Sequence, residues 1–141
     1  MADRPRTSLH DRFDLEIDFE FQAARRLPVL PETHPCSRLH GHSFRCQLRV
    51  AGTLEPTLGW VVDFADMEKA VEHLRDQLEH RYLNDVAGLD NPTSELLAAW
   101  MWREVAPLLP GLAGIVVAES SRTRCTYLGP ATPEHPEQVN S

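Results

Sequence analysis

Hydrophobic and polar residues alternate strictly in two segments near the start of the chain. In residues 13–21, FDLEIDFEF, apolar side chains occupy every second position and acidic side chains fill the positions between them. In residues 43–50, SFRCQLRV, apolar residues alternate with Arg45, Gln47 and Arg49. A period of two predicts a strand that is buried on one side only. Because one strand presents acidic residues and the other arginines, we expect the two to be antiparallel neighbours.

The pattern then changes to apolar residues at three- and four-residue steps, which predicts two helices. The first lies within residues 60–83 with Asp63 as its N-cap, and the second begins near Pro92 and Thr93. Two short strands follow, GIVVAE and CTYLG. This order, ββααββ, predicts an α+β domain in which a four-stranded antiparallel sheet carries both helices on one face. We expect the other face to need cover, which favours an oligomer.

Composition adds limits on the class of protein. The length of 141 residues predicts a single domain, with a core at about 13–129 and flexible segments at 1–12 and 130–141. The net charge of -7 argues against a general nucleic-acid-binding protein. The sequence has no apolar run of about 20 residues to span a membrane, and residues 1–12 lack the apolar core of a signal peptide. The three cysteines suggest no disulfide framework, so we expect a cytoplasmic protein.

The segment between the first two strands is rich in groups that bind metals or move protons. His40 and His42 are two residues apart, so on an extended chain both imidazoles face one side and can reach one ion. The alternative is that they are polar residues at the end of a strand. Cys36 in the same loop is either a reactive thiol or a small buried apolar residue.

Three more polar residues are candidates for chemistry. Glu79 and His80 follow the first helix and could form an acid–base pair, or they could be a solvated helix end. Adjacent helical residues do not face each other, so a contact between them requires the helix to end there. Glu119 shares a strand face with apolar residues, where it could accept hydrogen bonds from a ligand or could point into water.

Several short motifs occur together between residues 13 and 129: FQAARRLP, CSRLHGHSF, GWVVDF, LEHRYLND, NPTSELLA and VAESSRTRCTYLG. In this combination the chain resembles the 6-pyruvoyl-tetrahydropterin synthase and 6-carboxytetrahydropterin synthase family. It looks most like the bacterial branch that makes the queuosine precursor 6-carboxy-5,6,7,8-tetrahydropterin. The resemblance implies the tunnelling fold (T-fold), an oligomeric barrel that is commonly a hexamer, with active sites between subunits. It also implies a lyase that converts 7,8-dihydroneopterin triphosphate to 6-carboxytetrahydropterin, acetaldehyde and triphosphate.

The resemblance also assigns roles to individual residues. It makes His40 and His42 zinc ligands, Cys36 the base that transfers a proton, and His80 its partner, oriented by Glu79. It places the pterin ring on Glu119, with Thr93 and Ser94 as further contacts.

The chain departs from the family pattern at Arg25, and more mildly at Glu79, which stands in place of an aspartate. The family has a histidine, its third zinc ligand, where this chain has Arg25. An arginine offers no lone pair and its charge repels a dication. Three accounts stay open. His34 could complete the zinc site, or zinc could bind weakly or not at all while Arg25 holds the substrate's oxygens or triphosphate. Alternatively, the chain is a pterin-binding paralogue that is non-catalytic or has an altered activity.

Overall fold

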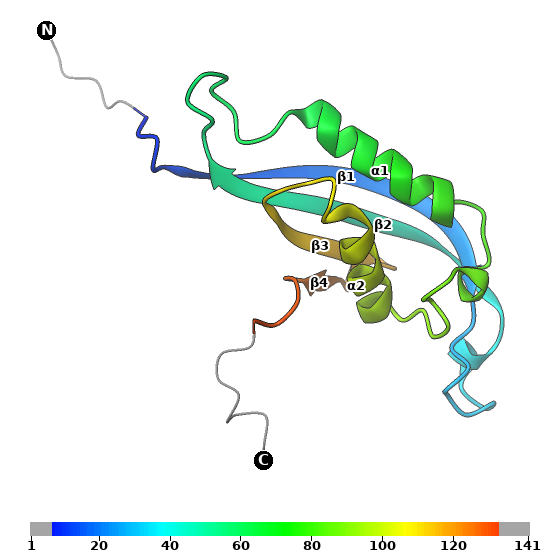
Figure 1. The fold of residues 1–141 in the computed structure, drawn as a ribbon. Coiled ribbons are helices and arrows are strands. Elements are labelled where there is room, and N and C mark those ends of the chain that lie inside the picture. Colours follow the sequence, from blue (N-terminus) through cyan, green and yellow to red (C-terminus); the bar gives the residue numbers. More distant parts are fainter. Residues whose placement is uncertain (1–6, 133–141) are drawn as a thin grey trace, which may run out of the picture.

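The computed structural model describes residues 7–132 and shows one four-stranded sheet with two helices (Figure 1). The strands lie in chain order, each antiparallel to its neighbour: β1 (Arg12–Arg25), β2 (His40–Thr53), β3 (Leu112–Ala118) and β4 (Cys125–Tyr127). The helices α1 (Phe64–Leu78) and α2 (Ser94–Val105) come between β2 and β3 in the chain. Short 3₁₀ turns, η1 (Pro35–Ser37) and η2 (Leu83–Asp85), lie in the connections. The predicted order and fold class are confirmed.

Most of the two end segments for which the sequence predicts flexibility falls outside the described residues. Within residues 7–132, neither helix has the length and apolar character that crossing a membrane would require.

The first two strands form the longest ladder of the sheet, from Arg12 opposite Thr53 to Arg25 opposite His40. Both strands extend beyond the alternating segments, so His40 and His42 lie inside β2 rather than before it. The small residues Ala23, Ala24 and Gly41 allow the pairing to continue, because a ladder needs backbone groups and not an alternating pattern. The alternating pattern alone predicts a connection from about Gln22 to His40, whereas the loop between the strands covers residues 26–39.

The core lies between the sheet and the two helices. Helix α1 packs over β1, and α2 packs over β3 and β4 (Figure 1). Phe21 and Phe44 stack with their ring centroids 4.9 Å apart, and Leu74 of α1 and Met101 of α2 are fully buried against the sheet. Asp63 caps α1 as predicted, by accepting a hydrogen bond of 2.9 Å from the backbone N–H of Ala65.

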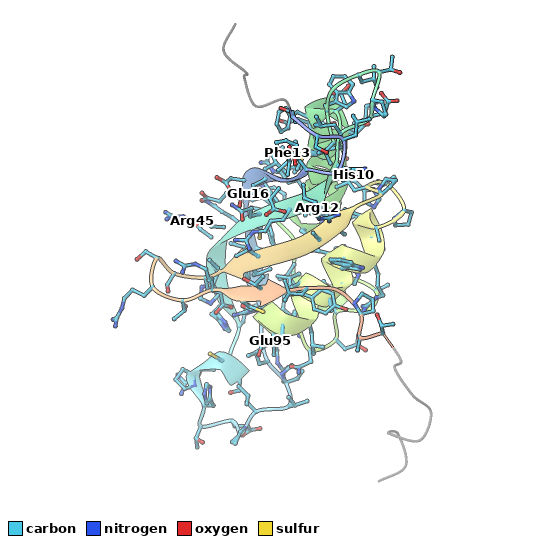
Figure 2. The ribbon with its side chains drawn as sticks, turned by 90° about the vertical axis from the view of Figure 1, so that its left-hand side faces the viewer. His10, Arg12, Phe13, Glu16, Arg45 and Glu95 are labelled. Atoms are coloured by element: carbon cyan, nitrogen blue, oxygen red, sulfur yellow. The ribbon has the colours of Figure 1, made fainter. Side chains whose placement is uncertain are left out.

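The other face of the sheet is dominated by charged and polar side chains. Arg45 projects from the side opposite α2 (Figure 2) and lies 3.9 Å from Glu20. Arg49 lies 3.8 Å from Glu16 in the same arrangement. The predicted pairing of acidic residues on one strand with arginines on the next is thus confirmed. This face therefore exposes little apolar surface that an oligomer would need to cover. The oligomer stays a prediction.

Candidate functional site

The chemically active residues gather at one end of the sheet. There the end of β1, the start of β2 and the C-terminal end of α1 lie together, at the right of Figure 1. The loop that carries η1 is tied to this end, because the backbone N–H of Leu27 donates to the carbonyl oxygen of Cys36 at 2.8 Å. The chain also joins β1 to the segment after α1, where the N–H of Ala24 donates to the carbonyl oxygen of Arg81 at 2.9 Å.

Arg25 lies at the centre of this region, with only 3% of its surface exposed. Its Nη1 donates to the carbonyl oxygen of Pro92 at 2.8 Å, and its Nη2 forms an ion pair with Glu119. The guanidinium carbon also lies 5.2 Å from the centre of the Phe44 ring, a cation–π contact. Burial lowers the pKa of Arg25, while the nearby Cys36 and Glu95 act to raise it.

His40 and His42 are residues of β2 and point to the same face of the sheet as Arg25 of β1, which is paired with His40. Their ring centroids are 4.9 Å apart and the rings are nearly perpendicular. The Nδ1 atom of His40 lies 2.7 Å from the carbonyl oxygen of Arg38, and its Nε2 atom lies 3.5 Å from Nε of Arg25. The pKa of His42 is lowered by burial, and then by the charges of Arg25 and His40.

These residues do not make the three-ligand site that a catalytic zinc ion requires. Within residues 7–132, the structure shows no group of three or more His, Cys, Asp or Glu side chains that could hold a metal ion. His34 is not brought to the pair formed by His40 and His42. Its Nδ1 instead accepts a hydrogen bond of 3.1 Å from the backbone N–H of Cys36 and caps η1. The charged group beside the two histidines is the guanidinium of Arg25.

Cys36 lies in η1 and is half-buried, whereas Cys46 is buried in the core as predicted. Burial raises the pKa of Cys46 far above its ordinary value. The pKa of Cys125 is also raised, by burial and by the charge of Glu95. Of the three thiols, Cys36 alone lies in the loop that reaches the site.

Glu79 and His80 are in contact because α1 ends before them. The last helical residue is Leu78, Glu79 is extended, and His80 has a positive φ of 56°. In this conformation Nε2 of His80 lies 3.0 Å from Oε1 of Glu79. The backbone N–H of His80 donates to the carbonyl oxygen of Gln22 at 2.6 Å, which fixes the pair to β1. The condition derived from helix geometry, that the helix must end here, is confirmed.

The side chain of His80 is 76% exposed and lines a cavity of about 560 Å³. This cavity is also lined by Gln22, Ser43 and His42, and His42 therefore shares it with His80. Within residues 7–132, the two predicted proton-transfer groups, His80 and Cys36, share no hydrogen bond.

Glu119 and Ser94 line a second cavity, of about 320 Å³, beside the N-terminus of α2. Glu95 and Thr123 also line this cavity, and Glu95 lies at the start of α2 in Figure 2. Thr93 has a structural role, because its hydroxyl accepts a hydrogen bond of 3.1 Å from the N–H of Leu96 and caps α2.

Sequence reasoning missed two groups in this region. One is the carbonyl oxygen of Pro92, which has no sequence signal because every residue has a carbonyl. The other is Glu95, which belongs to the motif NPTSELLA and could have been considered with Ser94.

Comparisons with known proteins agree with these observations. Residues 14–130 match the family model described as 6-pyruvoyl tetrahydropterin synthase. The chain is 38% identical over 119 residues to 6-carboxy-5,6,7,8-tetrahydropterin synthase of Synechocystis sp., covering 80% of this chain and 91% of that protein. It is also 38% identical over 73 residues to dihydroneopterin monophosphate aldolase of Pyrococcus furiosus, covering 52% of this chain and 60% of that protein. Its fold is similar to that of Caenorhabditis elegans 6-pyruvoyl tetrahydropterin synthase, with a TM-score of 0.78 at 24% identity, over 88% of this chain and 100% of that one.

Proposed function

Because the chain belongs to the 6-pyruvoyl tetrahydropterin synthase family, we propose that it is a lyase of the 6-carboxy-5,6,7,8-tetrahydropterin synthase type. The proposed reaction converts 7,8-dihydroneopterin triphosphate to 6-carboxytetrahydropterin, acetaldehyde and triphosphate. The observation that carries this proposal is the 38% identity to the Synechocystis enzyme across 91% of its length. We place the reaction in the cytoplasm, in the synthesis of the queuosine precursor.

The proposed base is Cys36, and the proposed partner in proton transfer is His80. Support for the second role comes from Glu79, whose carboxylate lies 3.0 Å from Nε2 of His80 and can fix its orientation. Since Cys36 and His80 share no hydrogen bond within residues 7–132, we propose that they meet at a boundary between subunits. The protein would then act as a homo-oligomeric ring, with no nucleic-acid or membrane partner.

The pterin ring is proposed to bind in the cavity lined by Glu119 and Ser94. A pterin carries an amino group and a ring N–H that can both donate to a carboxylate. Oε1 of Glu119 is buried and pairs with Arg25. The other carboxylate oxygen, Oε2, is therefore proposed to accept the hydrogen bonds of the ligand. No step of the reaction is assigned to zinc, because the residues present do not supply its three ligands.

The test is to incubate the purified chain with 7,8-dihydroneopterin triphosphate and to measure acetaldehyde and the pterin product. We expect both products, and we expect Cys36→Ala to lower the rate about 10²- to 10⁴-fold because it removes the proton-transfer group. His80→Gln should also lower the rate. His73→Gln is its matched control, because His73 lies on α1 against Glu104, outside the site. A folded protein that releases no acetaldehyde would exclude this reaction.

A second candidate function is pterin binding without turnover, and the observation that favours it is the buried Arg25 beside His40. Binding can be measured by the quenching of pterin fluorescence. Binding that depends on Glu119, without release of acetaldehyde, would support the non-catalytic reading over the lyase.

A further inference from the structure

We infer that Arg25 is a built-in cation that takes the place of a metal ion, so that His40, His42 and Glu119 are organised around a guanidinium and the site binds no zinc. This inference rests on the proposed function only for the identity of the ligand. The arrangement itself follows from the contacts of this chain.

The first step concerns the lone pair that a metal would need on His40. Its Nδ1 lies 2.7 Å from the carbonyl oxygen of Arg38, and a carbonyl can only accept, so the proton of the neutral ring is on Nδ1. The free lone pair is then on Nε2. This is the usual arrangement of a metal-binding histidine, whose other ring nitrogen is fixed by a carbonyl. Here Nε2 faces Nε–H of Arg25 at 3.5 Å instead.

The second step concerns the space in front of the two histidines. His40 and His42 have ring centroids 4.9 Å apart, and a shared zinc ion would lie about 2.0–2.1 Å from one nitrogen of each. Arg25 is directly opposite His40 in the β1–β2 ladder and points to the same face. A dication bound there would be in close contact with a fixed positive charge.

The third step is that the guanidinium cannot easily leave. It is held by the carbonyl oxygen of Pro92, the carboxylate of Glu119 and the ring of Phe44. If zinc displaced it, Oε1 of Glu119 would lose the partner it has within residues 7–132 and would stay buried. A buried carboxylate oxygen without a partner is unfavourable, so zinc binding is opposed twice, by repulsion and by the loss of this pair.

This arrangement makes Arg25 a positioning residue for the ligand site. Nη2 of the guanidinium pairs with Glu119, which lines the cavity of about 320 Å³, and Nε lies 3.5 Å from Nε2 of His40. The orientation of the proposed pterin-binding carboxylate therefore depends on Arg25, in the way that a metal orders its ligands.

The test is the metal content of the purified full-length chain, measured by mass spectrometry after incubation with zinc and dialysis. We expect far less than one zinc per subunit in the unmodified protein. Arg25→His, which supplies a lone pair and removes the charge, should bind about one zinc per subunit. Arg26→His is the matched control, because Arg26 is the next residue and is exposed, and it should remain free of zinc. Cobalt added to Arg25→His should give the visible absorption of a tetrahedral site.

Two further variants keep the test decisive if Arg25→His fails to fold. Arg25→Lys keeps the charge but not the planar set of donors, so it should stay free of zinc and bind the pterin several-fold more weakly. His40→Ala provides the opposite check. If the unmodified protein holds about one zinc per subunit and His40→Ala loses it, the inference is overturned. A folded Arg25→His that takes up no zinc overturns it as well.

The metal result and the proposed function can fail separately. A zinc-free protein that releases no acetaldehyde removes the lyase proposal and leaves the role of Arg25 intact. A protein that holds zinc at His40 and turns over the substrate removes the present inference and leaves the lyase.

Discussion

The ion pair between Arg25 and Glu119 gives a prediction about stability that does not depend on any ligand. Arg25 is 3% exposed and Glu119 is 28% exposed, so the two charges differ in how much water each can reach. Removing the carboxylate leaves a buried cation. Removing the cation leaves one buried oxygen, Oε1 of Glu119, on a side chain that water reaches elsewhere. We therefore expect Glu119→Gln to destabilise the fold more than Arg25→Met.

The magnitudes follow from what each variant leaves behind. Breaking a buried ion pair by removing one partner costs about 3–5 kcal/mol. For Glu119→Gln we expect the lower end, about 3 kcal/mol, because Arg25 keeps its contacts with Pro92 and Phe44. Arg25→Met should cost about 1–2 kcal/mol, the usual cost of leaving one polar group unsatisfied. The double variant should be close to Arg25→Met, which corresponds to a coupling energy of about 3 kcal/mol.

The assay is urea unfolding followed by far-UV circular dichroism, with all variants at one protein concentration because assembly would shift the apparent stability. The control cycle uses Arg45 and Glu20, which are 69% and 52% exposed and lie 3.9 Å apart. An exposed pair of this kind contributes about 0.2–1 kcal/mol. If the coupling energy between Arg25 and Glu119 is no larger than that of the control pair, the two residues do not form a buried ion pair.

Three further predictions concern the core, the thiols and the strained histidine. Leu74→Ala, which opens a cavity where α1 meets the sheet, should cost about 2–5 kcal/mol of unfolding free energy, while Leu96→Ala at an exposed site should cost less than about 0.5 kcal/mol. Iodoacetamide should label Cys36 and spare Cys46 from pH 7 to about pH 9, because burial raises the pKa of Cys46 and keeps the thiol protonated. Peptide mass spectrometry measures the labelling of each cysteine. Labelling of Cys46 as fast as Cys36 would contradict the prediction. His80→Asn should raise the free energy of unfolding by about 0.5 kcal/mol in urea, because asparagine tolerates the positive φ of this position. The same variant should lower turnover. A loss of stability would refute the strain argument.

Much of the fold could be predicted from the sequence because its signals are local. Alternation in residues 13–21 and 43–50 defined the first two strands, and Asp63 marked the start of α1. The ends of the elements depend on contacts that are not local. The helical pattern continues to residue 83, but α1 stops at Leu78. The backbone N–H of His80 donates to the carbonyl oxygen of Gln22 in β1 instead of continuing the helix. That competition depends on tertiary contacts, which periodicity does not report.

The central contact of the site, between Arg25 and Glu119, could not be predicted from the sequence. Cys36, His40, His42 and Glu119 were identified from their types and spacing, yet nothing local joins Arg25 to Glu119. Arg25 is the last residue of β1 and Glu119 directly follows β3. Because β2 lies between these strands, the contact depends on the strand order and on side chains that reach across a strand. Pairing preferences between neighbouring strands say nothing about such a contact.

The burial of Arg25 follows from parity along the strand. Residues two apart share a face, so Phe21 and Ala23 in the core place Arg25 on the same side. The same rule places Glu119 on the face of Val117, inside the sheet–helix layer. A single-residue slip of register in either strand would turn its charge outward and remove the site. The two residues must therefore compensate each other, because strand parity buries the cation and a buried cation is tolerated only with an anion of the same parity within reach.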